Sequence, residues 1–216
     1  MHYSRVEKIA EADLPTRWGS FRIMGFEGHL PPGATPGPMG KTVEEAVALV
    51  YGDCSDGDCN GKTPIVRVHS QCLTGDVFHS LRCDCRQQLE LALDTITAHG
   101  AGILIYEEQE GRGIGLMAKL RAYELQDQGR DTIQANEDLG YRSDHRDFTL
   151  PAEILKQLGV TAIRLITNNP EKVQAMENAG IRVVERISAE VAAELTSQKY
   201  LEVKRDKMGH LIGSLL

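Results

Sequence analysis

Short apolar segments rich in β-branched residues alternate along this chain with segments whose apolar residues repeat at helical spacing. Strands are expected at residues 20–26, 46–51, 64–69, 101–106, 162–167 and 181–186. Helices are expected at residues 86–98, 114–128 and 170–179, and in two stretches between about 188 and 211. Interleaved strands and helices predict an α/β fold, with a mixed β-sheet flanked by helices.

One segment interrupts this alternation. Residues 30–41, LPPGATPGPMGK, contain four of the eight prolines of the chain and three glycines. Such a composition does not form a packed element, so we expect a Pro/Gly-rich mobile loop between two strands. Residues 1–216 are expected to form a single domain.

Net charge and hydropathy bear on partners and location. The formal net charge is −7, which argues against nucleic acid as a partner. No segment approaches the roughly 18 apolar residues of a membrane span. The first ten residues, MHYSRVEKIA, contain no apolar signal region. We therefore expect a cytoplasmic protein with neither a membrane nor a nucleic-acid partner.

The densest chemical signal is the segment of residues 67–85, RVHSQCLTGDVFHSLRCDC. It places Cys72, Cys83 and Cys85 within fourteen residues, the last two as a C-x-C pair. Thiolates bind zinc strongly, and three protein ligands leave a fourth tetrahedral position for water, as in catalytic zinc sites. A fourth ligand from His69 or His79 would instead close the site and make it structural.

The polar neighbours of these cysteines favour metal binding over plain burial as small hydrophobic side chains. A reducing cytoplasm disfavours disulfides, so Cys54 and Cys59, in the Gly/Asp-rich residues 52–63, are expected to be free surface thiols. Zinc nucleobase deaminases carry H-x-E and P-C-x-x-C signatures. Here Gln71 stands at the glutamate position and the pair is C-x-C, which weakens a deaminase interpretation.

Two glycine- or proline-marked junctions have the features of anion sites. The segment of residues 110–115, EGRGIG, follows an expected strand and opens an expected helix, where free N–H groups and Arg112 favour phosphate. It lacks the Gly-Lys-Ser/Thr of a P-loop. Residues 167–172, TNNPEK, form a similar junction, although Pro170 is also a normal helix start.

Between these junctions, Asp144 and Arg146 alternate in a polar run. An extended backbone would place both side chains on one face. A carboxylate beside an arginine is often only a salt bridge, so the pattern by itself leaves both interpretations open.

Taken together, these segments resemble GTP cyclohydrolase II, and the likeness covers nearly the whole chain. The matching motifs are LPTxWG (14–19), RVHSxCLTGD (67–76), RCDC (82–85), QEGRGIGL (109–116), LQDQG (125–129), DTIxAN (131–136), DxRDF (144–148), TNNPxK (167–172) and KMGH (207–210). The resemblance implies zinc-dependent hydrolysis of GTP to 2,5-diamino-6-hydroxy-4-(5-phosphoribosylamino)pyrimidine, with release of formate and pyrophosphate, as the first step of riboflavin biosynthesis.

The resemblance also implies roles for individual residues. Cys72, Cys83 and Cys85 would bind one Zn²⁺ per chain. Arg146 matches the proposed nucleophile towards the α-phosphate and Asp144 the proton acceptor, while electrostatic stabilisation by Arg146 is the alternative because its pKa exceeds about 12. Tyr123 matches a position near the base. The positions that would contact the substrate are Arg67, Gln71, Gln88, Glu110, Gly111, Arg112, Thr132, Thr167 and Lys172. Mg²⁺ would accompany the triphosphate, and a homodimer is implied.

Two residues depart from the family pattern. Gln71 stands where glutamate is expected before the first zinc cysteine, and an amide has no general-base capacity. Arg86 follows the C-x-C pair where glycine is common, which adds bulk and charge. Three hypotheses follow. The chain is a GTP cyclohydrolase II, or a variant that stops at a formamidopyrimidine or uses another purine nucleotide, or a non-catalytic zinc protein that binds nucleotides.

Overall fold

The computed structural model describes residues 3–54, 59 and 61–191, except for the side chain of Thr132. Within these residues, seven strands form one sheet in the order β1-β2-β3-β5-β4-β6-β7. The strands are β1 (Arg5–Thr16), β2 (Gly19–His29), β3 (Val43–Tyr51), β4 (Ile65–Ser70), β5 (Gly102–Glu107), β6 (Ala162–Ile166) and β7 (Arg182–Ile187). Neighbours from β1 to β5 are antiparallel, and those from β5 through β4 and β6 to β7 are parallel. The expected mixed sheet and α/β class are confirmed.

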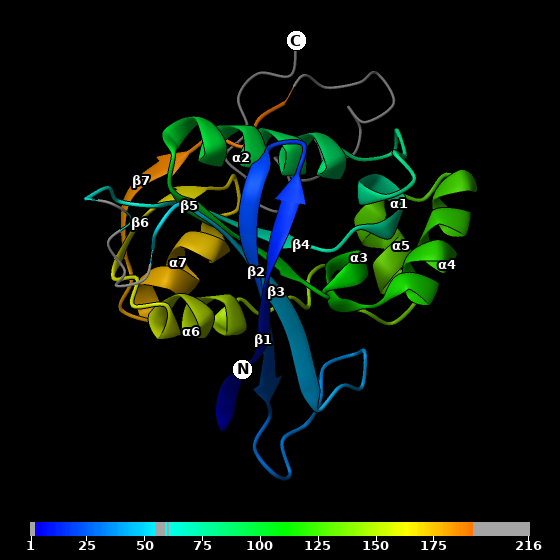
Figure 1. Cartoon of the computed structure of the whole chain (residues 1–216). Helices are drawn as coiled ribbons and strands as arrows, with labels where there is room; N and C mark the ends of the chain where they lie inside the picture. The colour runs from blue at the N-terminus through cyan, green and yellow to red at the C-terminus, as the bar shows by residue number, and fades with distance from the viewer. Residues whose placement is uncertain (1–2, 55–58, 60, 192–216) are drawn as a thin grey trace.

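Helices cover both faces of this sheet (Figure 1). α2 (Cys85–His99) lies on one side, and α6 (Thr149–Gln157) and α7 (Pro170–Asn178) lie on the other. Successive residues of β5 serve two cores, since Leu104 packs with the buried residues of α2, whereas Ile103 and Ile105 pack with those of α6 and α7. Because side chains alternate between the faces of a strand, a strand covered on both faces reads as a continuous apolar run.

The remaining helices lie beyond one end of the central strands (Figure 1). α1 (Leu73–Asp76) follows β4, and α3 (Glu110–Gly113) follows β5. α4 (Leu116–Asp127) and α5 (Thr132–Asp138) come next in the chain. Since β4 and β5 are parallel neighbours, their carboxyl ends deliver both connections to the same edge of the sheet.

Most of the expected elements are present. The six expected strands correspond to β2 through β7, and the three expected internal helices to α2, α4 and α7. Gly100 ends α2 as predicted, in the left-handed conformation with φ 85°. Residues 188–191 are not helical, which corrects the start of the expected final helical region. Its remainder and the KMGH motif lie outside the described residues.

Five of the described elements were not expected from the sequence, namely β1, α1, α3, α5 and α6. β1 pairs with β2 along nearly its whole length, from Arg5 opposite His29 to Thr16 opposite Gly19. As a largely exposed edge strand it is rich in charged residues, which protects an edge but hides the strand pattern. The other four elements are helices, and α6 carries Pro151 within its first turn, where proline is tolerated.

Residues 30–42 connect β2 to β3 without helix or strand. The mobility of residues 30–41 stays a prediction, as does the single-domain organisation of residues 1–216. None of the described helices is long and apolar enough to cross a membrane.

The prediction for Cys54 and Cys59 was wrong. The two residues form a disulfide, with Cα atoms 4.1 Å apart, and both side chains are buried in the larger core. The Gly/Asp composition of the turn suggested solvent exposure. Both cysteine side chains instead lie in the larger core, where they pack as apolar groups.

Candidate functional site

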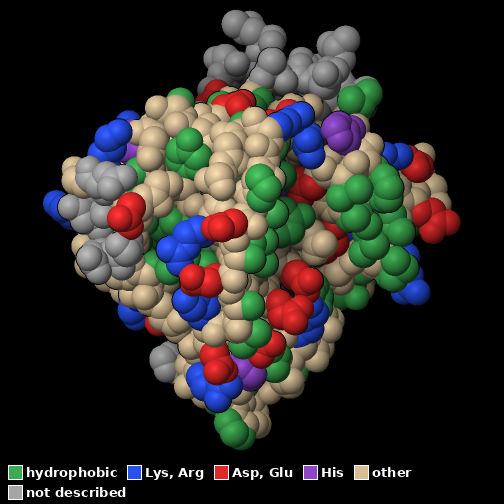
Figure 2. Space-filling model, in the orientation of Figure 1, with side chains coloured by type: hydrophobic (Ala, Val, Ile, Leu, Met, Phe, Trp, Pro, Cys, Tyr) green, Lys and Arg blue, Asp and Glu red, His purple; other side chains and the backbone are tan. Residues whose placement is uncertain are grey.

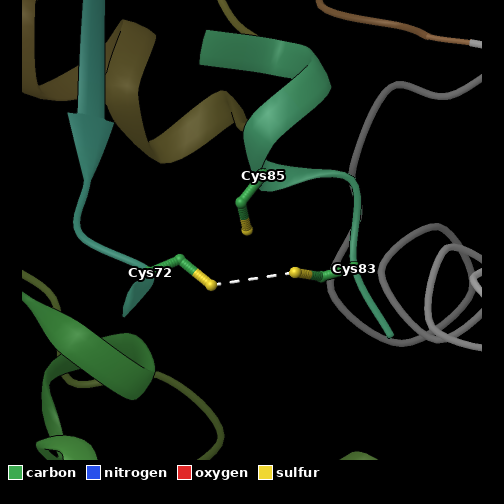
Figure 3. Close-up of side chains that lie close together, drawn as sticks. All are labelled: Cys72, Cys83 and Cys85. Atoms are coloured by element: carbon green, nitrogen blue, oxygen red, sulfur yellow. Dashed lines mark hydrogen bonds between the residues drawn. The ribbon is translucent and has the colours of Figure 1, made fainter. Parts of the chain in front are cut away.

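Three cysteine side chains converge just beyond the carboxyl end of β4 (Figure 3). Cys72 precedes α1, Cys83 lies in the connection from α1 to α2, and Cys85 is the first residue of α2. Their Sγ atoms all lie within 4.8 Å of one another, and those of Cys72 and Cys83 are 3.7 Å apart. The cysteines expected to act together are therefore brought together.

The spacing of these sulfur atoms fits a tetrahedral metal ion. Two Zn–S bonds of about 2.3 Å at a tetrahedral angle place their sulfur atoms about 3.8 Å apart. Among the described residues, no histidine or carboxylate joins the three cysteines in a potential metal-binding group. His69 and His79, the alternative fourth ligands, are thus not part of the cluster. Three protein ligands leave a position for a non-protein ligand.

A glycine makes room for this cluster. A Cβ atom at Gly75 would lie 2.9 Å from the Sγ of Cys83 and 3.2 Å from the Sγ of Cys72. Both distances are below ordinary van der Waals contact. The residue in α1 that faces the sulfur atoms therefore has to lack a side chain.

Hydrogen bonds among the three thiols shift their pKa values in different directions. Those from Cys83 and Cys85 lower the pKa of the Cys72 thiol, with a further contribution from the charge of Lys119. The bond with Cys72 in turn raises the pKa of Cys83 to about 11. Without a metal ion, the cluster therefore carries its negative charge mainly on Cys72.

A buried network beneath α1 holds Cys72 in place. Asp76 accepts hydrogen bonds from the Cys72 backbone N–H at 3.0 Å and from the Tyr106 hydroxyl at 2.8 Å. His69 Nε2 lies 3.1 Å from Asp76 Oδ1. Burial lowers the pKa of His69, and this outweighs the opposing effect of Asp76. A neutral His69 that donates from Nε2 fits this arrangement, because no described residue hydrogen-bonds to its Nδ1.

Lys119 of α4 contacts the same cluster, although the sequence did not predict it as a site residue. Its Nζ lies 3.1 Å from Cys72 Sγ and 2.7 Å from Glu110 Oε1. Burial lowers the pKa of Lys119, but Cys72 and Glu110 more than compensate and raise it, so the ammonium stays charged. No sequence signal marks it, because its contact with Cys72 joins residues 47 positions apart.

The cysteines form part of the wall of a cavity of about 550 Å³. The predicted site residues on this wall are Gln71, Cys72, Cys83, Cys85, Glu110, Gly111, Arg112, Tyr123 and Arg146. Tyr123 OH lies 3.3 Å from Thr74 Oγ1, and the Arg82 guanidinium lies over the Tyr123 ring at 4.8 Å. An enclosure of this size, with cations and an aromatic ring, suits a nucleotide base and its sugar.

The glycine-rich segment differs from the expected helix opening. Gly111 and Arg112 both have left-handed backbone conformations, and α4 begins only at Leu116. The Glu110 carboxylate accepts a hydrogen bond from the Leu73 N–H at 2.7 Å, which ties this turn to α1. The Arg112 carbonyl accepts one from the His145 N–H at 3.0 Å. The turn therefore joins the thiol cluster to the segment of Asp144 and Arg146.

Asp144 and Arg146 form a close ion pair. Arg146 donates from Nε to Asp144 Oδ1 at 3.0 Å and from Nη2 to Oδ2 at 2.5 Å. Burial raises the pKa of the Asp144 carboxyl, but the charge and hydrogen bonds of Arg146 outweigh it, so the net shift is downwards. Both groups therefore remain ionised. Arg146 lines the cavity and Asp144 does not.

Four other predicted contacts with described side chains are not on the cavity wall, namely Arg67, Gln88, Thr167 and Lys172. Arg67 donates to Gln88 Oε1 at 2.7 Å and to the Ile166 carbonyl at 3.1 Å. Thr167 Oγ1 accepts from the Asn169 N–H at 3.0 Å, and Lys172 donates to the Val68 carbonyl at 2.8 Å. Thr132 begins α5, and its side chain is outside the described part of the structure.

Two of these residues, Arg67 and Lys172, are buried cations. Together with the half-buried Arg146 they form a group near the carboxyl ends of β4 and β6 that we call the basic cluster. Burial lowers the pKa of Lys172, and the charges of Arg67 and Arg146 lower it further. Burial likewise lowers the pKa of Arg67 to about 10. Cations that repel one another in a buried place favour a bound anion.

The two departures from the family pattern have different positions. Gln71 lines the cavity next to Cys72. Arg86 does not line it, because its guanidinium donates to the Asp76 carbonyl at 2.9 Å and pairs with Glu90 at 2.8 Å. Only Gln71 is therefore in a position to meet a molecule in the cavity.

Comparisons with known proteins bear directly on this site. A family model described as GTP cyclohydrolase II matches residues 7–188. A GTP cyclohydrolase-2 from Citrobacter koseri is 51% identical over 210 residues, which is 97% of this chain and 99% of that protein. One from Escherichia coli (strain K12 / DH10B) is also 51% identical, over 96% of this chain and 98% of that protein. A solved two-domain 3,4-dihydroxy-2-butanone 4-phosphate synthase from A. baumannii gives a TM-score of 0.42 at 17% identity, covering 86% of this chain and 40% of that one.

Proposed function

Since the chain belongs to the GTP cyclohydrolase II family and is an enzyme of that class, we propose that it opens the purine ring of GTP and releases formate and pyrophosphate. The product would be the diaminopyrimidine ribotide that begins riboflavin biosynthesis. The observation that carries this proposal is the thiol cluster in the wall of a cavity that Arg112, Tyr123 and Arg146 also line.

The metal we propose is zinc, one ion per chain, held by Cys72, Cys83 and Cys85. Its support is the three-sulfur donor set with its spacing and the open fourth position. Bound Zn²⁺ supplies hydroxide near neutral pH by lowering the pKa of a water molecule, and hydroxide is the nucleophile that ring opening requires. Tyr123 and Glu110, both on the cavity wall, would orient the guanine base.

For Arg146 we propose an electrostatic role towards the α-phosphate. The bidentate pair with Asp144 supports this choice, because it stabilises the protonated guanidinium and so opposes the deprotonation that nucleophilic attack would need. Asp144 would hold the guanidinium in its orientation. Preorganised cations of this kind stabilise charge that develops during phosphoryl transfer.

The remaining phosphates would lie near the basic cluster. Arg67 and Lys172 supply positive charge there, and Thr167 and Gln88 supply hydrogen-bonding groups. Mg²⁺ would be carried mostly by the phosphate oxygens. Thr132 remains a candidate contact on the strength of the family match alone.

The test of this function uses purified zinc-loaded protein with GTP and Mg²⁺. We expect formate, pyrophosphate and the diaminopyrimidine in equal amounts, measured by enzyme-coupled assays and mass spectrometry. Pyrophosphate without formate would instead indicate an early stop at a formamidopyrimidine, which the amide of Gln71 next to Cys72 would favour. GTP binding with no product would indicate a non-catalytic protein.

A variant separates the two halves of the reaction. Arg146→Ala is expected to lower the rate of pyrophosphate release at least about 100-fold, which is typical for loss of a preorganised charge. Zinc content should not change, because Arg146 is not one of the three proposed metal ligands. Normal pyrophosphate release by this variant would remove Arg146 from the proposed chemistry.

We further propose that the enzyme is a homodimer, as the family resemblance implies. Support comes from five large hydrophobic side chains that are solvent-exposed, which we call the apolar patch. They are Val77, Phe78, Leu81, Met117 and Leu120. Figure 2 shows hydrophobic side chains gathered on the side of the molecule where α1 and α4 lie. Large exposed apolar patches commonly mark protein interfaces. The cytoplasmic location stays a prediction.

A further inference from the structure

Lys119 is the only lysine among the described residues whose ammonium contacts a sulfur atom of the thiol cluster. Three contacts fix the position of its Nζ, which lies 3.1 Å from Cys72 Sγ, 3.0 Å from Thr74 Oγ1 and 2.7 Å from Glu110 Oε1. The residue is 9% exposed. A lysine buried to this degree is stable only when its charge is compensated, and here both compensating groups belong to the site.

The charge of the cluster explains why a cation is needed there. Three thiolates around a divalent ion carry one net negative charge, in a place where burial makes unbalanced charge costly. A hydrogen bond to one thiolate withdraws electron density from its sulfur atom. That sulfur then donates less to the metal ion, which leaves the ion a stronger Lewis acid.

Glu110 completes the arrangement from the opposite side. One of its carboxylate oxygens accepts from Lys119 and the other accepts from the Leu73 N–H, next to Cys72. Glu110 also lines the cavity. Lys119 therefore connects Glu110, a cavity residue that would contact the guanine base, to Cys72, which is one of the proposed metal ligands.

We propose that Lys119 is a positioning residue of the metal centre, which holds the Cys72 thiolate by a charge-assisted hydrogen bond and couples it to Glu110. The inference rests on the proposed zinc site. It predicts that Lys119 affects both the affinity for metal and the electronic character of the Cys72–metal bond, because both depend on the same sulfur atom.

The experiment compares Lys119→Met with Lys119→Arg and with Arg121→Met. Arginine keeps the charge and the donor, whereas methionine keeps much of the volume and loses both. Arg121 lies on the same helix, is exposed, and provides a matched control. Zinc affinity is measured by competition with a chromophoric chelator, and the thiolate-to-metal charge-transfer band is recorded after substitution with Co²⁺.

For Lys119→Met we expect zinc affinity to fall about 10- to 100-fold, the usual effect of losing an outer-shell partner, because the lost charge compensation and orientation of the Cys72 thiolate outweigh the stronger donation of its sulfur atom. The charge-transfer band should move to longer wavelength, because a sulfur atom without its hydrogen bond gives up charge more easily. Lys119→Arg should recover most of both properties, and Arg121→Met should match the wild type. Wild-type affinity and band position in Lys119→Met would overturn the inference.

Loss of Lys119 also leaves the Glu110 carboxylate buried without its cation, so a second variant is needed. Lys119→Met combined with Glu110→Gln removes both charges. We expect the weakened zinc binding and the band shift to persist in this double variant. Full recovery would assign the effect to Glu110 alone and overturn the inference. A wild-type protein that binds neither zinc nor cobalt would instead overturn the proposed metal centre itself.

Discussion

Gly75 shows how a single residue limits what the thiol cluster tolerates. Its α-carbon faces the sulfur atoms so closely that even a methyl group would lie 2.9 Å from Cys83 Sγ. The neighbouring atoms cannot give way freely, because they are the proposed metal ligands and the Cβ of Cys85. The site therefore depends on the absence of a side chain at this position as well as on the three thiols.

Gly75→Ala is expected to lower the zinc content from one ion per chain to a small fraction, because the added methyl group separates the sulfur atoms. Zinc is measured by plasma mass spectrometry after gel filtration. Gly25→Ala is the control, since a Cβ at Gly25 would meet nothing within 4 Å. Full zinc content in Gly75→Ala would contradict the proposed convergence of the three cysteines.

His69 gives a second prediction at this scale, for the dependence of stability on pH. Burial lowers the pKa of His69 in the folded protein below its ordinary value of 6.5. The unfolded chain therefore takes up a proton first as the pH falls below about 6.5. Stability due to neutral His69 is present above that pH and is lost below it, by up to about 1.4 kcal/mol per pH unit.

The measurement is urea unfolding between pH 5 and 7.5. His69→Gln should be less stable at pH 7 but should lose less stability on acidification than the wild type. His79→Asn serves as the control, because His79 is exposed and asparagine tolerates its positive φ of 54°. Equal slopes for the wild type and His69→Gln would show that His69 is not held neutral.

At the scale of elements, buried strands and capped helices were the features most accessible from sequence. β4, β5 and β6 are apolar runs because helices cover both faces, and α2 ends where Gly100 permits the left-handed turn. β1 was missed because an edge strand needs charge more than apolar periodicity. α6 was missed because its buried residues, among them Leu150, Ile154 and Leu155, fill only a short element.

The residues of the site also differ in how well the sequence predicts them. The three cysteines were recognisable because ligands close in sequence carry their own spacing. Lys119 and Asp76 were not recognisable, because their importance comes from contacts across 47 and 30 residues, with Cys72 and Tyr106 respectively. Such partners depend on how α4 and β5 pack, which local pattern does not encode.

The disulfide between Cys54 and Cys59 yields a prediction for the stability of the folded protein. The Cys54–Cys59 bond closes a loop with a sequence separation of 5. Loop-closure entropy for so short a loop corresponds to about 2 kcal/mol of stability. Reduction should therefore lower the free energy of unfolding by about that amount and leave zinc binding unchanged.

This is measured by urea unfolding with a phosphine reductant and without it. The double variant Cys54→Ala and Cys59→Ala should unfold like the reduced protein and should not respond to reductant. Alanine is chosen because both positions are buried among apolar side chains. A wild-type protein equally stable with reductant would show that the bond contributes nothing.

At the scale of the whole molecule, charge is distributed unevenly. The chain carries a net charge of −7, yet the three cations of the basic cluster, two of them buried, gather near the carboxyl ends of β4 and β6. The total charge argues against partners that need a broad basic surface, whereas a phosphorylated small molecule needs only a local one. The apolar patch lies elsewhere, on α4 and the connection between α1 and α2.

The proposed homodimer is tested through that patch. Analytical ultracentrifugation of the wild type should give twice the 23.8 kDa of the chain. Phe78→Glu combined with Met117→Glu should give the monomer mass, because two charges in a buried interface are costly. Val184→Glu is the control, since Val184 is exposed on β7 and outside the patch. A wild-type monomer, or a double variant that remains dimeric, would exclude the patch as the dimer interface.

The two parts of the site differ in how much polypeptide they need. The three thiols come from fourteen consecutive residues, whereas Arg67 meets Ile166 across 99 positions and Lys172 meets Val68 across 104. Contacts close in sequence form before those that must close a long loop. On the ribosome, a nascent chain therefore completes the segment with the three proposed zinc ligands well before the last strands emerge, so zinc capture is expected to precede competence for GTP during synthesis.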